Sequence, residues 1–398
     1  MEKFTVFTLP NAISQYNAFS HFNRCYLEIF KQLGGEIIYL NSMINVRIDT
    51  QTLSQAFLFY FGYANNQMLW DIYRAIPTLP IVNHSIDHPF EFFIPTPELG
   101  EYVPSYFPVT FDPTWIEFIG RNRKHPNSPP YAAAFVPLAG FVHPDVTEFQ
   151  PASQRPIEIL FAGSTIDPEA LRREWHEKRS ESIAKVIDTV VEQKINNYHL
   201  PLDLMLEQGL NPECIQNVRC IATIFQCANE YTRAHYRLKL LRTLAQSGIS
   251  VTAYTNHIEL LNNLLGVNNF DIRPAVDFNE LLKLMAQAKM VLNSRPNTEG
   301  ITERVPSTML NGAVSINDTN QYLSREFTEE QAIFYDYQKL EELPDKVRHL
   351  LNHPDKLDLM AATAQENARQ HHTVLHRVHK ILTSIEEFRT MLIAAHQS

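Results

Sequence analysis

The segment 290–318, with the sequence MVLNSRPNTEGITERVPSTMLNGAVSIND, constrains the fold of this chain more than any other. A predicted buried strand at 290–293 leads through a polar loop at 294–301 into a short helix, and a second predicted strand follows at 313–317. Pro306 fits the first turn of that helix, and Gly312 is the usual left-handed stop after it. The segment predicts strand, loop, helix and strand, the unit of a parallel α/β sheet.

The polar loop of this unit is the first candidate binding site. In parallel sheets, ligands bind at the carboxyl ends of the strands, where this loop lies. A helix N-terminus with free N–H groups, next to Arg295 and Arg304, suits a diphosphate. The alternative is that Glu299, Glu303 and Arg304 form a solvated ion pair, and the chemistry of the loop alone leaves both interpretations open.

Several residues of this stretch resemble the donor-binding segment of group 1 glycosyltransferases, specifically the spore-maturation-type branch. The similar features are a strand ending in Leu292-Asn293, Arg304 opening a short helix, the turn 311–313, and a strand ending at Asp318. Further similar residues lie downstream: Tyr322, Leu323, Phe327, Phe334, Tyr335, Asp336, His372, Thr373 and Arg377. The resemblance covers residues 154–381 well and the N-terminal part loosely.

The resemblance implies a GT-B fold, in which two Rossmann-like α/β domains with parallel sheets face each other across a central cleft. The implied domains are an acceptor-side domain at 1–150 and a nucleotide-sugar donor domain at 151–385, with 386–398 as a helix end that can return to the first domain. The segment 168–226 is polar, helical in pattern and longer than a minimal crossover, so it predicts a helical insertion in the second domain.

One departure from the wider group concerns the stereochemistry. Many retaining members carry two glutamates eight residues apart in this segment. Here Glu299 is followed by Ser307 at that spacing, and Glu303 by Asn311. The pair is absent, so retention or inversion stays open.

Composition excludes several classes of function. The net charge of −10 argues against general nucleic-acid binding, which needs a basic face. The first βαβ pattern lacks a GxGxxG sequence, so no dinucleotide cofactor is expected. Four cysteines without CxxC spacing fit a reduced, cytoplasmic setting. No apolar run reaches the roughly 18 residues of a membrane-spanning helix, and we expect neither a transmembrane segment nor a signal peptide.

A second candidate site follows the apolar residues 81–82. His84, Asp87 and His88 stand there, and a carboxylate beside an imidazole can orient it as a general base toward an acceptor hydroxyl. The branch is similar in carrying Asp87-His88-Pro89. Two alternatives remain: a metal site, for which no fourth ligand is evident, and a loop cap in which His88 packs against Phe90.

The second domain supplies the remaining donor-site candidates. Gly163 and Ser164 follow a predicted strand, and a glycine lets backbone N–H groups approach phosphate, although a plain turn explains them equally. Arg237, on an amphipathic helix at 231–246, best matches an arginine of the branch, and its guanidinium fork suits a diphosphate unless it is only an exposed cation. The donor-binding candidates are Gly163, Ser164, Arg237, Tyr254, Asn256, Arg273, Asn293, Arg295, Glu299, Glu303, Arg304, Ser307 and Thr308.

These features together predict a metal-independent glycosyltransferase that moves a sugar from a nucleotide-sugar donor to an unknown acceptor, which could be a glycan, a protein or a small molecule. The donor is a substrate, so no cofactor and no metal is expected. The catalytic candidates are Asp87 or His88 as base if the enzyme inverts, and Arg304 on the leaving diphosphate. The alternatives are an inactive GT-B module that binds a glycan or protein partner, and a sugar-nucleotide isomerase. The sugar, the base and the oligomeric state stay open.

Overall fold

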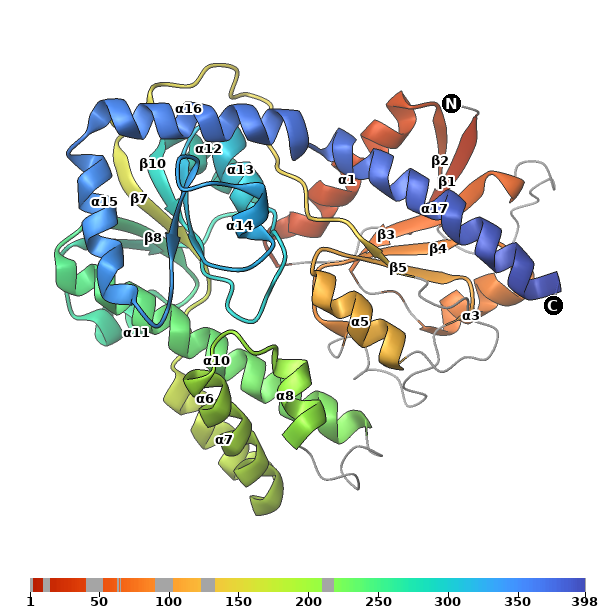
Figure 1. Cartoon of the computed structure of the whole chain (residues 1–398), viewed down its shortest axis with the longest axis horizontal. Helices are drawn as coiled ribbons and strands as arrows, with labels where there is room; N and C mark the ends of the chain where they lie inside the picture. The colour runs from red at the N-terminus through yellow and green to blue at the C-terminus, as the bar shows by residue number, and fades with distance from the viewer. Residues whose placement is uncertain are drawn as a thin grey trace. The chain divides into compact units, whose positions relative to one another are not determined.

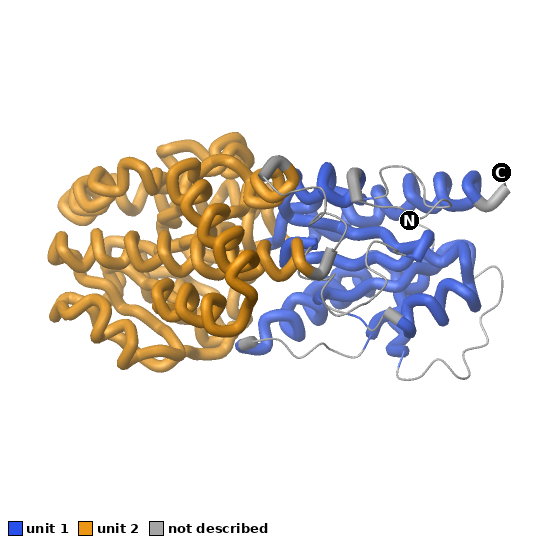
Figure 2. The backbone as a smooth tube through the Cα atoms, turned by 90° about the horizontal axis from the view of Figure 1, so that it is seen from below, with its two compact units in different colours: residues 1–139, 374–398 blue, residues 140–373 orange. Residues whose placement is uncertain are grey.

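A computed structural model describes residues 3–9, 15–40, 53–62, 64, 66–89, 103–122, 133–209 and 218–397 (Figure 1). The chain forms two compact units, coloured separately in Figure 2. Unit 1 comprises residues 1–139 and 374–398, and unit 2 comprises residues 140–373. Each unit contains a six-stranded parallel sheet, so the predicted pair of Rossmann-like α/β domains is confirmed. The predicted cleft between them stays a prediction.

The sheet of unit 1 has the strand order β2-β1-β3-β4-β5-β6. The apolar run Ala56–Phe61 forms β3 inside this sheet, and all six of its residues are buried, as expected for a parallel strand covered on both faces. The strands are β1 (Phe4–Thr8), β2 (Gly35–Tyr39), β3, β4 (Ile81–Ser85), β5 (Tyr106–Thr110) and β6 (Ala134–Phe135).

The helices of unit 1 include one from the far end of the sequence. Helix α17 (Val374–Gln397) belongs to this unit, where Phe388 stacks on Phe107 with ring centroids 4.6 Å apart. Arg389 Nη2 also donates to Ala56 O over 2.9 Å. The other helical elements are η1 (Gln15–Asn17), α1 (Ala18–Gln32), α3 (Asn66–Ala75) and α5 (Pro113–Asn122).

The sheet of unit 2 has the order β12-β11-β10-β7-β8-β9. Its strands are β7 (Ile157–Ala162), β8 (Val251–Thr255), β9 (Phe270–Pro274), β10 (Ala288–Leu292), β11 (Val314–Asp318) and β12 (Ala332–Tyr335). Met290 of β10 pairs with Ile159 of β7 on one side and Val314 of β11 on the other. The loops that follow these three strands therefore leave the same edge of the sheet, side by side.

A helical insertion separates β7 from β8. It contains α6 (Pro168–Lys178), α7 (Glu181–Asn196), α8 (Leu202–Gly209) and α10 (Val218–Ser247). The sequence predicted an insertion ending at 226 and a separate helix at 231–246, but α10 runs through both segments. No glycine or proline interrupts Val218–Ser247, which explains why the helix continues.

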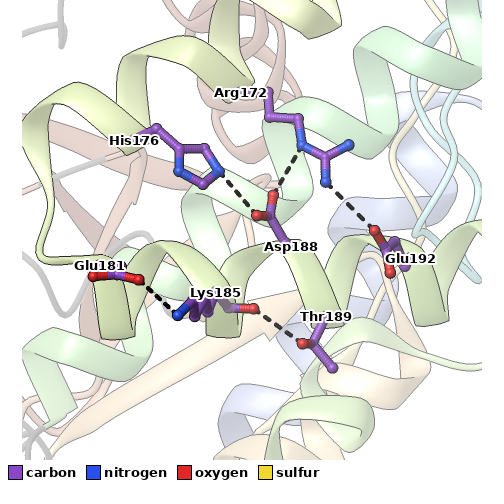
Figure 3. Close-up of polar contacts among 7 residues, drawn as sticks. All are labelled: Arg172, His176, Glu181, Lys185, Asp188, Thr189 and Glu192. Carbon is purple, nitrogen blue, oxygen red and sulfur yellow. Dashed lines mark hydrogen bonds and ion pairs between the residues drawn. The ribbon is translucent and has the colours of Figure 1, made fainter.

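One carboxylate links the first two helices of the insertion (Figure 3). Asp188 of α7 lies 3.0 Å from Arg172 Nε and 2.9 Å from His176 Nε2, both on α6. Caps begin the two helices, with Asp167 accepting from Glu169 N and Ser180 accepting from Ile183 N. Side-chain caps thus begin α6 and α7, and the ion pairs of Asp188 hold the two helices together.

The remaining helical elements of unit 2 cover its sheet (Figure 1). They are η2 (Ala152–Gln154), α11 (Ile258–Leu265), α12 (Phe278–Gln287), α13 (Arg304–Leu310), α14 (Leu323–Glu326), η3 (Leu340–Glu342), α15 (Leu343–Leu351) and α16 (Pro354–His371). Across the described part of the chain, we find no helix with the length and apolar character needed to cross a bilayer.

Gly312 follows the end of α13 with φ 70°, so its predicted left-handed helix stop is confirmed. The buried guanidinium of Arg155 lies against this turn, donating from Nη1 to Asn311 O over 3.0 Å and to Ala288 O over 3.1 Å. A Cβ on Gly312 would lie 2.6 Å from Arg155 Nη2. The turn therefore needs glycine both for its backbone conformation and for space.

We expect Gly312→Ala to lower the free energy of unfolding by about 3 kcal/mol, which combines left-handed backbone strain with displacement of Arg155. Gly248 is the matched control, because it has φ 76° and open space around its Cβ position. Gly248→Ala should cost only about 1 kcal/mol. Urea unfolding of both variants measures the difference, and equal losses would show that the contact with Arg155 contributes nothing.

Candidate active site

The turn after β7 is held by two arginines from distant parts of unit 2. Arg304, at the start of α13, donates from Nη1 to Ala162 O, and Arg237 of α10 donates from Nη1 to Ser164 O. Arg237 Nη2 also reaches Ser294 O, in the loop after β10, over 3.4 Å. The structure thus brings the predicted Gly163, Ser164, Arg237 and Arg304 together.

Gly163 leaves little room in this turn. A Cβ at this position would lie 3.1 Å from Phe161 Cζ and 3.7 Å from Arg237 Cζ. Its N–H donates to Tyr254 O over 3.0 Å, so this amide is already bonded within the protein. Gly163 therefore provides close backbone packing against the arginine, and its own N–H is not the group that would face a phosphate.

Positive charge accumulates around this turn. Burial and the nearby guanidinium groups of Arg233, Arg304 and Arg295 lower the pKa of Arg237 to about 9. Glu303 Oε1 lies 4.0 Å from Arg304 Nε, a long ion pair. These neighbours repel the Arg237 charge, and an anion bound beside Arg237 would relieve that repulsion. Their forked donors suit phosphate oxygens.

The loop after β10 is fixed at Asn297, a residue that no motif in the sequence singles out. Asn297 has φ 70°, and its Nδ2 donates to Asn229 Oδ1 over 3.0 Å and to Thr232 Oγ1 over 2.8 Å. Both partners lie on α10, which also carries Arg233 and Arg237. Asparagine tolerates the left-handed region better than most residues, which was the one available signal in the sequence.

The two candidate glutamates lie at the edge of the arginine group. Burial raises the pKa of Glu299, although its Oε2 accepts a hydrogen bond of 3.1 Å from Gln321 N and Lys194 attracts the charged form. The side chain of Glu303 is 18% exposed beside Arg304. Both stay candidates for binding sugar hydroxyls.

Three other donor-site candidates are buried inside unit 2. Asn293 Nδ2 donates to Ser315 Oγ and to Asn317 Oδ1, each over 2.9 Å. Ser307 Oγ accepts from Phe141 N over 3.0 Å, and Thr308 is fully buried. Burial keeps these side chains away from a ligand, so we assign them a role in holding β10 and α13. Moreover, α13 has only seven residues, and its N-terminus by itself forms no anion site.

The candidates on β8 and β9 lie next to the turn. Tyr254 and Arg273 are paired in register, and Arg273 Nη1 donates to the Tyr254 hydroxyl over 3.2 Å. Asp271 also binds Arg273 and raises its pKa. Asn256 follows β8 and is exposed. Tyr254 O accepts a hydrogen bond from Gly163 N, which connects these residues to the turn after β7.

Unit 1 places its histidines differently from the prediction. His84 lies inside β4 rather than in the loop after it; its ring stacks on Phe61, and its Nε2 is 3.2 Å from Val136 O. His88 packs against Trp115 and Phe118 with centroids 5.3 and 5.0 Å away. Burial lowers the pKa of both histidines to about 3.

Such a low pKa makes His88 a weak base at neutral pH. Asp87 is only partly buried, and its backbone oxygen accepts from Ser85 Oγ over 3.0 Å. It is the remaining candidate base of this loop. Phe90, the expected packing partner of His88, lies outside the described residues. Within those residues, the structure contains no group of three histidine, cysteine or acidic side chains that could hold a metal ion.

Comparisons with known proteins agree with this architecture. Residues 235–383 match a family model described as glycosyl transferase-like. A DNA-modifying β-glucosyltransferase superposes with a TM-score of 0.53 at 11% identity, covering 98% of this chain and 100% of that one. A glycosyltransferase from Rickettsia africae superposes with a TM-score of 0.50 at 9% identity, covering 98% and 99%. No protein of curated function matches the sequence. The chain thus has the GT-B fold of these structures, and the segment similar to the glycosyl transferase-like model begins in α10 of unit 2 and ends in α17 of unit 1.

We expect Arg295→Gln to change the melting temperature of the ligand-free protein only slightly, because the substitution removes both a repulsion from Arg237 and an attraction to the Asp318 carboxylate. The stabilisation by inorganic diphosphate should fall by about 2 kcal/mol, the typical contribution of a charged hydrogen bond. Thermal unfolding with and without diphosphate measures both effects. Arg325→Gln, an exposed arginine on α14, is the control and should keep the full stabilisation. An unchanged diphosphate effect in Arg295→Gln would contradict this site.

Proposed function

We propose that this protein is a glycosyltransferase that moves a sugar from a nucleotide-sugar donor to a hydroxyl group of an acceptor. The observation that carries the proposal is that Arg237 and Arg304 both bind carbonyl oxygens at the carboxyl end of β7, with Arg233 and Arg295 near Arg237. Three of these arginines lie within the segment 235–383 that matches the glycosyl transferase-like model. A donor diphosphate would neutralise their charge, so we assign these arginines a role in binding the donor.

The proposed donor is a nucleoside diphosphate sugar. The β-glucosyltransferase of similar fold has uridine diphosphoglucose as its substrate. In this chain, Arg237 and Arg304 would hold the diphosphate, and Glu299 and Glu303 would bind sugar hydroxyls. Tyr254, Asn256 and Arg273, on the neighbouring strand ends, would lie toward the nucleoside.

The reaction breaks the bond between the anomeric carbon and the β-phosphate oxygen, and forms a bond from that carbon to the acceptor oxygen. The leaving diphosphate gains negative charge as the bond breaks, and Arg304 would stabilise that charge. The acceptor proton passes to a base, and Asp87 is our candidate if the enzyme inverts. The arginines supply the positive charge that a divalent metal supplies in other sites, so we propose metal independence.

We also place the chain, as a finer proposal, in the spore-maturation-type branch and in the cytoplasm. The branch rests on Leu292-Asn293, Arg304, the turn 311–313 and Asp318. The compartment rests on the small number of cysteines and their spacing. No contact described here favours the alternative of an inactive binding module.

A panel of UDP-, GDP-, ADP-, dTDP- and CMP-sugars tests the proposal directly. Thermal shift measures binding, and release of free nucleotide, with and without EDTA, measures turnover. Stabilisation by one nucleotide family with slow, EDTA-resistant hydrolysis supports the transferase and its metal independence. The absence of any shift and of any turnover would refute the proposed donor site.

We expect Arg304→Ala to reduce turnover of the selected donor at least about hundredfold, because removing one donor to the charge that develops in a transition state typically has this effect. Circular dichroism and the melting temperature would check the fold, since Arg304 also binds Ala162 O. Arg325→Ala should retain wild-type turnover. Normal turnover by Arg304→Ala would show that Arg304 does not contact the leaving group.

A further inference from the structure

Asp318, the last residue of β11, connects two parts of unit 2 that are far apart in the sequence. Its Oδ1 accepts from Arg295 N over 3.2 Å, at the start of the loop after β10. Its Oδ2 accepts from the Tyr198 hydroxyl over 2.8 Å, in the turn between α7 and α8. The residue is 5% exposed, so this carboxylate is shared by the loop and the insertion inside the protein.

The turn that carries Tyr198 is held firmly. Lys194 of α7 is 2% exposed and donates from Nζ to Tyr198 O and, over 2.8 Å, to Leu200 O. The Tyr198 ring lies 4.9 Å from the rings of Tyr236 and Tyr337. Backbone and ring are therefore both fixed, and the Tyr198 hydroxyl is directed at Asp318.

A buried carboxylate needs such donors to remain charged. Burial raises the pKa of Asp318, whereas the hydrogen bonds from Tyr198 and from Arg295 N lower it. The titratable and charged groups that face Asp318 are Tyr198, Arg295, Lys194, Glu299, Tyr335 and Tyr337. Without the Tyr198 hydroxyl, the carboxylate loses a donor that both orients it and compensates its burial.

We propose that Tyr198 is a positioning residue of the donor site: through Asp318 it fixes the Arg295 backbone and thereby the loop that contributes to diphosphate binding. The inference rests on the proposed function and adds a role for the helical insertion. A second contact supports the same arrangement, because Asn297, two residues after Arg295 in this loop, donates to Asn229 and Thr232 on α10 of the insertion. The insertion thus holds the donor loop at two points.

Tyr198→Phe tests the proposal, because it removes the hydroxyl and keeps the ring. We expect the dissociation constant of inorganic diphosphate, measured by calorimetry, to rise about tenfold, corresponding to loss of a hydrogen bond to a charged group. The KM of the nucleotide sugar should rise by a similar factor with kcat nearly unchanged, as expected for lost uniform binding.

Tyr236→Phe is the matched control within the same tyrosine cluster. Its hydroxyl donates to Lys194 O and Ile195 O and does not bind Asp318. This variant should lose stability to a similar extent as Tyr198→Phe, but keep wild-type affinity for diphosphate. Equal affinities of all three proteins, or equal weakening in both variants, would overturn the positioning role.

Asp318→Ala completes a double-mutant cycle. Adding Tyr198→Phe to Asp318→Ala should change diphosphate affinity less than twofold, because the hydroxyl acts through the carboxylate; a full tenfold further loss would overturn the proposal. Calorimetry with diphosphate needs no turnover, so a wild-type protein that binds diphosphate but transfers no sugar would refute the proposed activity and still test Tyr198. Failure of the wild type to bind diphosphate would refute both.

Discussion

The contacts of two arginines with the carboxyl end of β7 are the interaction on which the proposed donor site depends. Arg237 and Arg304 approach each other because both donate to carbonyl oxygens of the turn after β7. Carbonyl groups accept hydrogen bonds from guanidiniums and so orient them without removing their charge. These two contacts join α10 and α13 to the end of β7, beside the loop after β10.

Parallel strand pairing brings these residues together. Strand β7 lies more than a hundred positions before β10 and β11 in the sequence. Nevertheless, Leu292 of β10 pairs with Phe161 of β7 and with Ile316 of β11. The loop after β10 is then fixed by two polar contacts, from Arg295 N to Asp318 and from Asn297 to Asn229. Backbone register positions the loops, and a few buried side chains fix their conformation.

The sequence predicted the features that depend on local rules. Apolar runs predicted the buried strands, and Gly312 predicted the end of α13, because burial on both faces and left-handed φ values leave direct signals in the residue pattern. His84 was misplaced, since one strand boundary cannot be read from a short apolar run. Tyr198 and Asn297 were not selected, because their partners lie 120 and 65 or more positions away and follow only from tertiary packing.

The connection of α17 to unit 1 has a consequence for biosynthesis. Unit 1 contains residues from both sides of unit 2 in the sequence, and Phe388 fills a fully buried position against Phe107. On the ribosome, unit 2 can complete its own sheet while the first unit still lacks this helix. The apolar surface of the N-terminal sheet that α17 covers therefore stays exposed, and accessible to chaperones, until residues 374–397 are synthesised.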